Sequence, residues 1–325
     1  MATKTYREAL NEALREEMHR DQDVFIIGQD VGKFEGAYRV TQGLLSEFGP
    51  KRVKDAPISE TAIMGAGIGA AMVGLRPVVE FMTINFTLVA MDQIVNNAAK
   101  IRYMFGGQVS VPLVIRTPGG GGQQLTAQHS QNLEHWFAHV PGLKVVAPVS
   151  PADAKGLLKM AIRDPDPVFV LENLALYNTK GEVPDDEYEI PLGSADVKCE
   201  GTDLTIFAHS RMVNVALRAA ERLEDEDGVS AEVVDLRSLR PLDTETILNS
   251  VRKTNRAMTV EEGWATYGVG GEIVALLMDH VFDDLDAPVK RVGGEEVPMP
   301  YSKPLERAAI PSVDRVYEMA LQVLA

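Results

Sequence analysis

The sequence contains a single cysteine, Cys199, among its 325 residues. One thiol cannot form an intrachain disulfide, and no CxxC pair is available to hold a metal ion. Because proteins of oxidising compartments commonly use disulfides, this cysteine content indicates a reducing compartment, and we expect a cytoplasmic protein. We assign no chemical role to Cys199.

Clusters of basic residues and long apolar runs are also missing. Acidic residues outnumber basic ones by 47 to 32, which gives a net charge of −15. A surface of this sign repels phosphate backbones, so nucleic acid is not an expected partner. The first residues carry neither an apolar signal core nor an Arg-rich transit segment, and no apolar stretch is long enough to span a bilayer. We therefore expect no membrane association.

Short apolar strands alternate with helical patterns along most of the chain. The first block of the alternation has strands at 24–28, 78–81, 111–116, 143–146 and 168–172 and helices at 5–20, 61–74, 87–104 and 151–163. The second block has strands at 204–208, 231–236, 257–260 and 289–292 and helices at 212–224 and 270–282. This order predicts an α/β fold with two doubly wound domains, each a largely parallel sheet covered on both faces. We expect an N-terminal domain over 1–180, a polar linker over 181–196 and a smaller C-terminal domain over 197–325.

The segment GAGIGA at 65–70 matches the dinucleotide-binding pattern G-x-G-x-x-G/A. That pattern requires a strand leading into the first glycine and an acidic residue about 20 residues later. Here the preceding residues 59–64 have a helical pattern, and Glu80 follows Gly65 by only 15 residues. We favour a helix whose small residues allow close packing, with a nicotinamide oxidoreductase as the alternative.

A second glycine-rich segment, at 119–122, lacks the Lys-Ser/Thr pair of a phosphate-binding loop. It suits either a mobile active-site loop or a simple turn. His129 follows in a polar stretch, and His is the side chain that changes charge most readily near neutral pH. His135 and His139 lie nearby in the sequence, but no third ligand completes a convincing metal set.

Glu60 is the most informative acidic residue. It follows Ser59 directly before the small-residue helix. Ser59 could cap that helix, and a carboxylate in the first turn is favoured by the helix dipole. From local sequence alone, this structural interpretation of Glu60 is sufficient.

Nine segments, in this order, resemble one known family. They are DAPISE (55–60), GLRP (74–77), EFMTINF (80–86), DQIVN (92–96), AQHSQ (127–131), PGLKVV (141–146), DAKGLL (153–158), RPLD (240–243) and VPMPY (297–301). Together they resemble the beta subunit of the thiamin-diphosphate-dependent dehydrogenase component of 2-oxoacid dehydrogenase complexes, and the pyruvate dehydrogenase members most of all. The resemblance covers nearly the whole chain.

The resemblance implies a transketolase-like N-terminal domain that holds the aminopyrimidine of thiamin diphosphate, followed by a transketolase C-terminal domain. Glu60 would hydrogen-bond the pyrimidine ring nitrogen and favour the imino tautomer that deprotonates the thiazolium carbon. Phe86 would stack on the pyrimidine, and the backbone of Met82 would face its amino group. His129 would lie beside the substrate and the lipoyl group and would stabilise charge or transfer a proton during reductive acylation.

The resemblance also bears on metal ions. Some members of the family bind potassium through backbone carbonyls, and the matching positions here are Leu113, Ala161, Ile162, Asp164 and Asp166. Single-chain thiamin enzymes hold magnesium and the diphosphate with a Gly-Asp-Gly motif, which this sequence lacks. A diphosphate needs a divalent ion or cationic donors to offset its charge. We therefore expect an alpha subunit to hold the magnesium, with two alpha and two beta chains in the assembly.

The expected function is thiamin-dependent oxidative decarboxylation of pyruvate with acyl transfer to lipoyl groups of an acyltransferase component. The acidic C-terminal domain would attract a basic binding module of that component. Branched-chain 2-oxoacid and acetoin dehydrogenases share much of the same pattern and stay open as alternatives. A non-catalytic assembly subunit is a further alternative, although it would need neither Glu60 nor His129.

Overall fold

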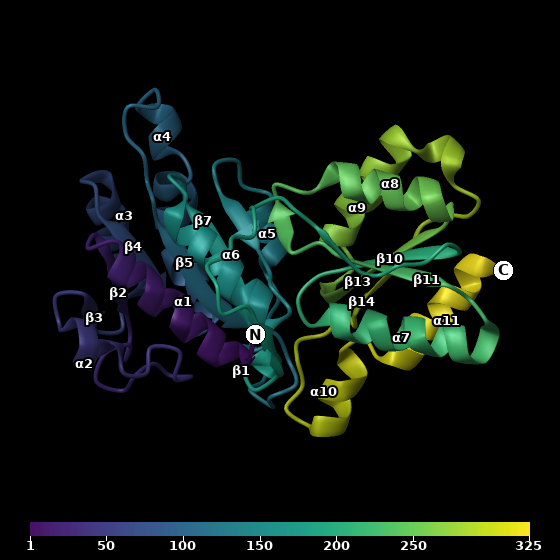
Figure 1. Ribbon diagram of the computed structural model, residues 1–325, viewed down its shortest axis with the longest axis horizontal. Helices are drawn as coiled ribbons and strands as arrows, with labels where there is room; N and C mark the ends of the chain where they lie inside the picture. Colours follow the sequence, from purple (N-terminus) through teal and green to yellow (C-terminus); the bar gives the residue numbers. More distant parts are fainter. The chain divides into compact units, whose positions relative to one another are not determined.

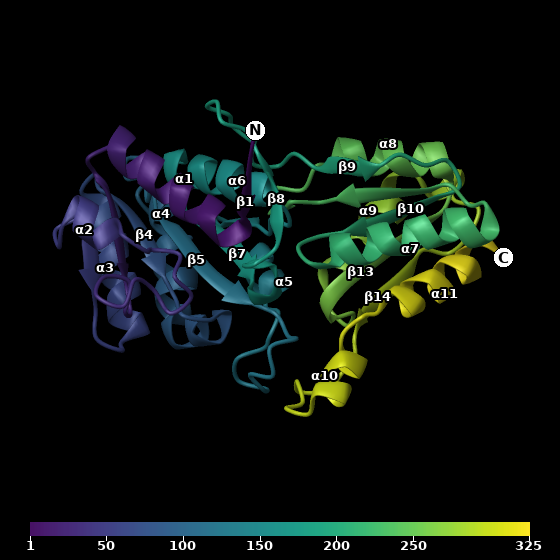
Figure 2. The same ribbon diagram turned by 60° about the horizontal axis from the view of Figure 1, so that its bottom comes forward.

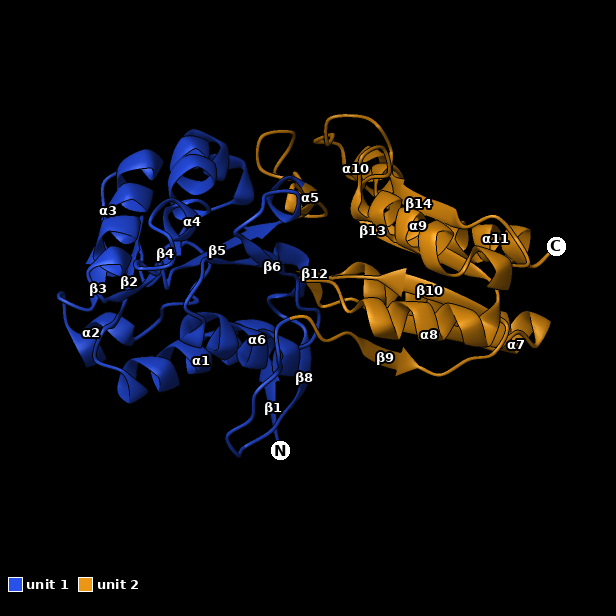
Figure 3. Ribbon diagram, turned by 90° about the horizontal axis from the view of Figure 1, so that it is seen from above, with its two compact units in different colours: residues 1–119, 136–192 blue, residues 120–135, 193–325 orange.

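The computed structural model describes residues 1–325, which form two compact units. Unit 1 comprises residues 1–119 and 136–192, and unit 2 comprises residues 120–135 and 193–325 (Figure 3). The segment 120–135 thus groups with unit 2, although the sequence prediction placed all of 1–180 in one domain. A short helix, α5 (Glu134–Ala138), lies where the chain passes back from unit 2 to unit 1.

Unit 1 is built on a parallel sheet in the strand order β6-β7-β5-β4-β2-β3. Helices α1 and α6 cover one face of this sheet, and α3 and α4 lie on the other (Figure 3). The strands are β1 (Ala2–Thr5), β2 (Val24–Gly28), β3 (Val53–Asp55), β4 (Arg76–Glu80), β5 (Val114–Gly119), β6 (Lys144–Val146), β7 (Val168–Asn173) and β8 (Lys180–Val183). The helices are α1 (Tyr6–Arg20), α2 (Leu44–Phe48), α3 (Glu60–Met72), η1 (Ile84–Ala90), η2 (Gln93–Ala98), α4 (Ile101–Met104), α6 (Pro151–Arg163) and η3 (Leu174–Leu176).

Unit 2 has the strand order β14-β13-β10-β11-β9, parallel except for β9 at the edge. Helices α8 and α9 lie on one face of the sheet and α7 and α11 on the other (Figure 1). The strands are β9 (Asp196–Cys199), β10 (Leu204–Ala208), β11 (Ala231–Asp235), β12 (Ser238–Arg240), β13 (Ala257–Trp264) and β14 (Lys290–Gly294). The helices are α7 (Met212–Asp227), α8 (Thr244–Thr254), α9 (Val269–His280), η4 (Phe282–Asp284), α10 (Lys303–Ala309) and α11 (Val313–Leu324).

Local sequence signals explain the best-defined helices. Thr5 and Glu8 form a reciprocal capping box at the start of α1. Helix α6 begins with the Ser150 side chain accepting the N–H of Asp153, with Pro151 at a position where no N–H is needed. Both helices bury an apolar face and pack against each other on the sheet (Figure 2). The predicted two-domain α/β fold is confirmed.

One local prediction was wrong. The helix expected over 87–104 is a 3₁₀ segment, a π-helical segment and one turn of α-helix. The Asn97 side-chain amide donates to the backbone carbonyl of Asp92 there, and side chains that bond to backbone groups compete with regular helical bonding. The segment expected as a linker, 181–196, contains most of β8, which pairs antiparallel with β1 of the same unit. Helix α3 buries one face and leaves the other exposed.

Candidate functional site

The residues predicted to hold the cofactor lie at the carboxyl edge of the unit 1 sheet. Gln29 follows β2, Glu60 comes shortly after β3, and Met82 and Phe86 follow β4. These three strands are neighbours in the order β4-β2-β3. Ligands of open α/β sheets bind outside the carboxyl ends of the strands. The structure thus brings Glu60, Met82 and Phe86 to the edge where a ligand is expected.

Glu60 is the first residue of α3, and only 8% of its surface is exposed. The Gln29 side chain donates a hydrogen bond from Nε2 to Oε1 of Glu60 at 3.1 Å. The predicted cap is not formed: the Ser59 side chain accepts no helix N–H, and its backbone carbonyl accepts the N–H of Ile63 instead. Glu60 is therefore oriented by Gln29 and by its place at the helix start, with its second carboxyl oxygen left for another partner.

Met82 lies between β4 and η1, Phe86 lies within η1, and both are half-buried. Between them, the Thr83 hydroxyl is buried and has no hydrogen-bond partner. Thr61 of α3 donates from its hydroxyl to the carbonyl of Val89 at 2.8 Å, which ties the start of α3 to η1. Buried hydroxyl groups are rarely left unpaired, so Thr83 is consistent with a polar ligand completing this edge. The polar and aromatic groups here fit an aminopyrimidine.

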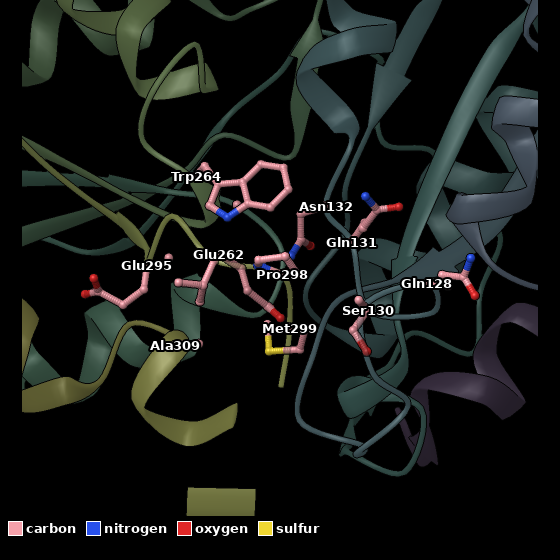
Figure 4. A pocket seen from close by; sticks show the side chains of 14 residues that line it. Gln128, Ser130, Gln131, Asn132, Glu262, Trp264, Glu295, Pro298, Met299 and Ala309 are labelled. Atoms are coloured by element: carbon pink, nitrogen blue, oxygen red, sulfur yellow. The ribbon is translucent and has the colours of Figure 1, made fainter. Parts of the chain in front are cut away.

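His129 belongs to unit 2, on a loop that follows β5. Its backbone N–H donates to the carbonyl of Thr126 at 3.2 Å. Residues on both sides of His129 line a cavity of about 260 Å³ within unit 2 (Figure 4). The lining residues are Ala127, Gln128, Ser130, Gln131, Asn132, Glu262, Gly263, Trp264, Gly294, Glu295, Val297, Pro298, Met299 and Ala309. The site predicted around His129 thus adjoins a cavity whose walls combine polar side chains with apolar ones, including one indole ring.

The glycines at 65–70 lie inside α3 and not in a turn between a strand and a helix. A Cβ at Gly67 would lie 2.6 Å from a methyl group of Val79, so the helix passes too close to β4 for any side chain there. The acidic residue of the alternative motif, Glu80, is buried and ion-paired with Arg116. The segment therefore serves helix–sheet packing and has neither the turn nor the free acid of a dinucleotide site.

The five predicted potassium positions lie at the opposite, amino end of the unit 1 sheet. Ala161 and Ile162 lie in the last turn of α6, where the negative end of the helix dipole favours cations. The Arg76 guanidinium already donates to the carbonyls of Ile162 (3.0 Å) and Asp164 (3.4 Å). A carbonyl oxygen has two acceptor sites, so these groups retain capacity for a monovalent cation.

Leu113 and Asp166, the two remaining predicted potassium positions, already take part in other interactions. The Leu113 carbonyl accepts the N–H of Val168 at 2.9 Å, and the Asp166 carboxylate pairs with Arg102 and Lys144. The chain contains no group of three or more His, Cys, Asp or Glu side chains that could hold a metal ion.

A buried ionic cluster that the sequence did not reveal spans three strands of unit 1. Arg116 of β5 donates two hydrogen bonds to Glu172 of β7, at 2.8 and 2.6 Å, and one to Glu80 of β4. Tyr177 donates its hydroxyl to Glu172. Burial alone would lower the pKa of Arg116, but Glu172 and Glu80 raise it. Nothing in the local pattern of these strands distinguishes a charged core from an apolar one.

A second buried cluster lies in unit 2. His209 and Glu134 are hydrogen-bonded at 3.1 Å between Nε2 and Oε1, and Glu261 accepts the N–H groups of Val269 and Gly270 at the start of α9. Burial would lower the pKa of His209, but the bond to Glu134 raises it. Burial raises the pKa of Glu261 to about 7, and the charge of Glu134 adds to this effect.

The raised pKa of Glu261 makes stability pH-dependent. Between pH 4.5 and about 7 the folded chain retains a proton that the unfolded chain releases, so the free energy of unfolding falls as pH rises through this window. Glu261→Gln removes this proton equilibrium. We expect the free energy of unfolding, measured with urea, to fall between pH 5 and 7. In Glu261→Gln this fall should be smaller by on the order of 3 kcal/mol. Glu272→Gln, at an exposed carboxyl in the first turn of α9, is the control and should retain the slope of the unsubstituted chain.

Comparisons with known proteins identify the family. The transketolase pyrimidine binding domain matches residues 2–180, and the transketolase C-terminal domain matches residues 193–316. The mitochondrial pyruvate dehydrogenase E1 component subunit beta-2 of Oryza sativa subsp. japonica is 53% identical over 320 residues, which cover 97% of this chain and 85% of that protein. This chain belongs to the transketolase-like family of pyruvate dehydrogenase E1 beta subunits.

One bacterial member of the family is similar over nearly its full length. The E1 beta subunit of Rickettsia conorii is 51% identical over 319 residues and is covered to 98%, as is this chain. Among solved structures, one described as a split gene transketolase, an inactive beta4 tetramer, matches with a TM-score of 0.82 at 25% identity over 98% of this chain and 97% of the other. The family resemblance expected from the nine sequence segments is confirmed.

Proposed function

We propose that the chain is the beta subunit of a thiamin-diphosphate-dependent pyruvate dehydrogenase, which decarboxylates pyruvate oxidatively and transfers the acyl group to lipoyl groups. The observation that carries the proposal is the buried Glu60 carboxyl at the carboxyl edge of the sheet, in a chain that is 53% identical to a named E1 beta subunit. The bound cofactor would supply a nucleophilic carbon and an electron sink for decarboxylation.

The residues of this chain would bind one end of that cofactor. Glu60, oriented by Gln29, would hydrogen-bond a pyrimidine ring nitrogen and exchange a proton with it. Phe86 would cover the face of the ring, and the Met82 backbone would meet its amino group. The unpaired Thr83 hydroxyl offers a further polar contact. His129, on its loop in unit 2, would stabilise charge or transfer a proton when the acyl group passes to the lipoyl group.

The chain would need an alpha subunit to hold magnesium and the diphosphate. Supporting this, α3 begins with Glu60 and leaves Ala62, Ala66, Gly69 and Met72 exposed, and Val73 just beyond it is 79% exposed. Exposed apolar patches of this kind are typical of interaction sites. We propose an assembly of two alpha and two beta chains, with each cofactor between an alpha and a beta chain.

The negative charge of the C-terminal domain indicates a further partner. The lipoyl acyltransferase component would dock on the acidic surface of the C-terminal domain, where the last two turns of α7 expose Glu224, Asp225, Glu226 and Asp227. Electrostatic docking of this kind is fast and weakens with salt. We also retain potassium binding at Leu113, Ala161, Ile162, Asp164 and Asp166, the domain boundaries 1–180, 181–196 and 197–325, and a cytoplasmic location. No helix has the combination of length and apolar character that crossing a bilayer demands.

The test is co-purification with the alpha chain encoded by the same organism, followed by assays with an artificial electron acceptor. Pyruvate, branched-chain 2-oxoacids and acetoin are supplied separately, with and without thiamin diphosphate and magnesium. We expect turnover of pyruvate that requires the alpha chain and both additions. A preference for one of the other substrates would reassign the specificity. Turnover by the lone chain with NAD, or an active complex that is indifferent to Glu60, would overturn the proposal.

A further inference from the structure

The loop that carries His129 has an unusual backbone. It is closed at its base by a hydrogen bond from the N–H of Gly120 to the carbonyl of Gln131 at 3.2 Å. Within it, Gly120 and Gly122 have φ values of +88° and +95°, and Gln124 and Thr126 have values of +56° and +67°. Left-handed φ is costly for a β-branched residue such as Thr126. A backbone in this state persists only where its surroundings hold it.

Glu306, on α10, provides the strongest of these restraints. Its side chain is 1% exposed although α10 is a short helix near the surface. One carboxylate oxygen, Oε1, accepts the N–H of Gly122 at 2.8 Å and the N–H of Gln124 at 2.9 Å. Hydrogen bonds from N–H groups to a carboxylate are stronger than those to a neutral acceptor. A single side chain, 184 and 182 residues away in sequence, thus restrains two of the positions with left-handed φ.

Two further ionic side chains hold the same stretch. Glu262, at the end of β13, accepts the N–H of Gly121 at 2.7 Å, and Arg211, just before α7, donates to the carbonyl of Gly121 at 3.1 Å. The fit is close, because a Cβ at Gly121 would lie 2.8 Å from the Met299 side chain. The sequence left a mobile loop and a simple turn open as alternatives, and the structure shows a backbone held by three ionic groups of unit 2.

We propose that Glu306 and Glu262 are positioning residues that fix the His129 loop in its working conformation. Burying two carboxylates costs solvation energy that a passive turn would not require. Here that cost is offset by bonds to backbone N–H groups of one loop, and those bonds restrain the backbone a few residues before His129. The inference rests on the proposed role of His129 in acyl transfer to lipoyl groups.

The first test separates the two half-reactions in the enzyme assembled with its alpha chain. Pyruvate decarboxylation is followed with an artificial acceptor, and acyl transfer is followed with a free lipoyl domain. We expect Glu306→Ala to lower kcat for acyl transfer by about tenfold or more while KM for the lipoyl domain and the rate of decarboxylation change by less than about twofold, since small displacements of an acting group cost large factors in rate. Glu306→Gln, which retains an acceptor oxygen, should restore part of the loss.

Glu245→Ala, at an exposed carboxyl in the first turn of α8 of the same unit, is the matched control and should leave both half-reactions unchanged. A double variant shows whether Glu306 acts through His129. If it does, adding Glu306→Ala to His129→Ala lowers kcat for acyl transfer only a little further. Full additivity of the two losses, or equal losses in both half-reactions, would overturn the positioning role.

Hydrogen exchange provides a measurement that does not depend on activity. In Glu306→Ala the amides of Gly122 and Gln124 should exchange at least about tenfold faster, while those of β10 stay protected, since local opening is measured separately from global unfolding. Unchanged exchange at Gly122 and Gln124 would refute the restraint itself. Absence of pyruvate turnover in the unsubstituted enzyme would instead refute the proposed function, and the exchange result would still decide the restraint.

Discussion

Glu60→Gln is expected to reduce turnover of the assembled enzyme by about 10²–10⁴-fold, the range over which a positioned acid–base group acts. Gln retains the size of the side chain and can still meet the Gln29 amide, but it cannot exchange a proton with a ring nitrogen. The variant should therefore fold and assemble normally. The measurement is single-turnover decarboxylation of pyruvate, with thermal unfolding and assembly with the alpha chain as checks on structure.

Glu245→Gln is a suitable control for Glu60→Gln, because Glu245 is an exposed acid in the first turn of α8. It should have near-normal activity. If Glu60→Gln decarboxylated pyruvate at a near-normal rate, the role assigned to this carboxyl would be wrong, even if the enzyme still required thiamin diphosphate.

Arg116→Met is expected to have the largest effect on stability. The substitution leaves Glu80 and Glu172 buried beside each other without a counter-charge, and removing one partner of a buried ion pair typically costs about 3–5 kcal/mol. Unfolding by urea, followed by circular dichroism, measures the loss. Arg39→Met removes a surface ion pair with Glu35 and should cost less than about 1 kcal/mol.

A triple variant tests the cause of that loss. Replacing Glu80 and Glu172 with Leu in the Arg116→Met background removes the unpaired charges, and buried ionic groups replaced by apolar residues are often tolerated. We expect the triple variant to recover part of the lost stability. If it were less stable than Arg116→Met alone, packing at Arg116 rather than charge would explain the first result.

The parts of the fold that the sequence predicted are those determined by neighbouring residues. The prediction of a helix over 151–163 agrees with α6 because Ser150, Pro151 and the apolar periodicity all act locally. The pairing of β1 with β8 joins residues about 180 positions apart, and no local pattern indicates it. The same limit applies to the ionic cluster around Arg116, which forms only when three strands come together.

The candidate site also contains residues that the sequence predicted and residues that it did not. Glu60, Met82, Phe86 and His129 were predicted because each lies in a short segment that resembles the family. Gln29 was missed, since its contact with Glu60 depends on the neighbouring strands β2 and β3. Glu306 was missed for a similar reason: its partners are backbone N–H groups of a distant loop, and backbone groups leave no trace in side-chain identity.

The exposed apolar face along α3 has a consequence for how the chain is produced. A copy synthesised without its partner would present Met72 and Val73 to water, with Leu88 and Val89 of η1 also exposed. Such a copy would be prone to associate with other copies or with chaperones. Balanced production of the two polypeptides would therefore favour a good yield, and a surplus of this one alone is expected to accumulate as inactive oligomers.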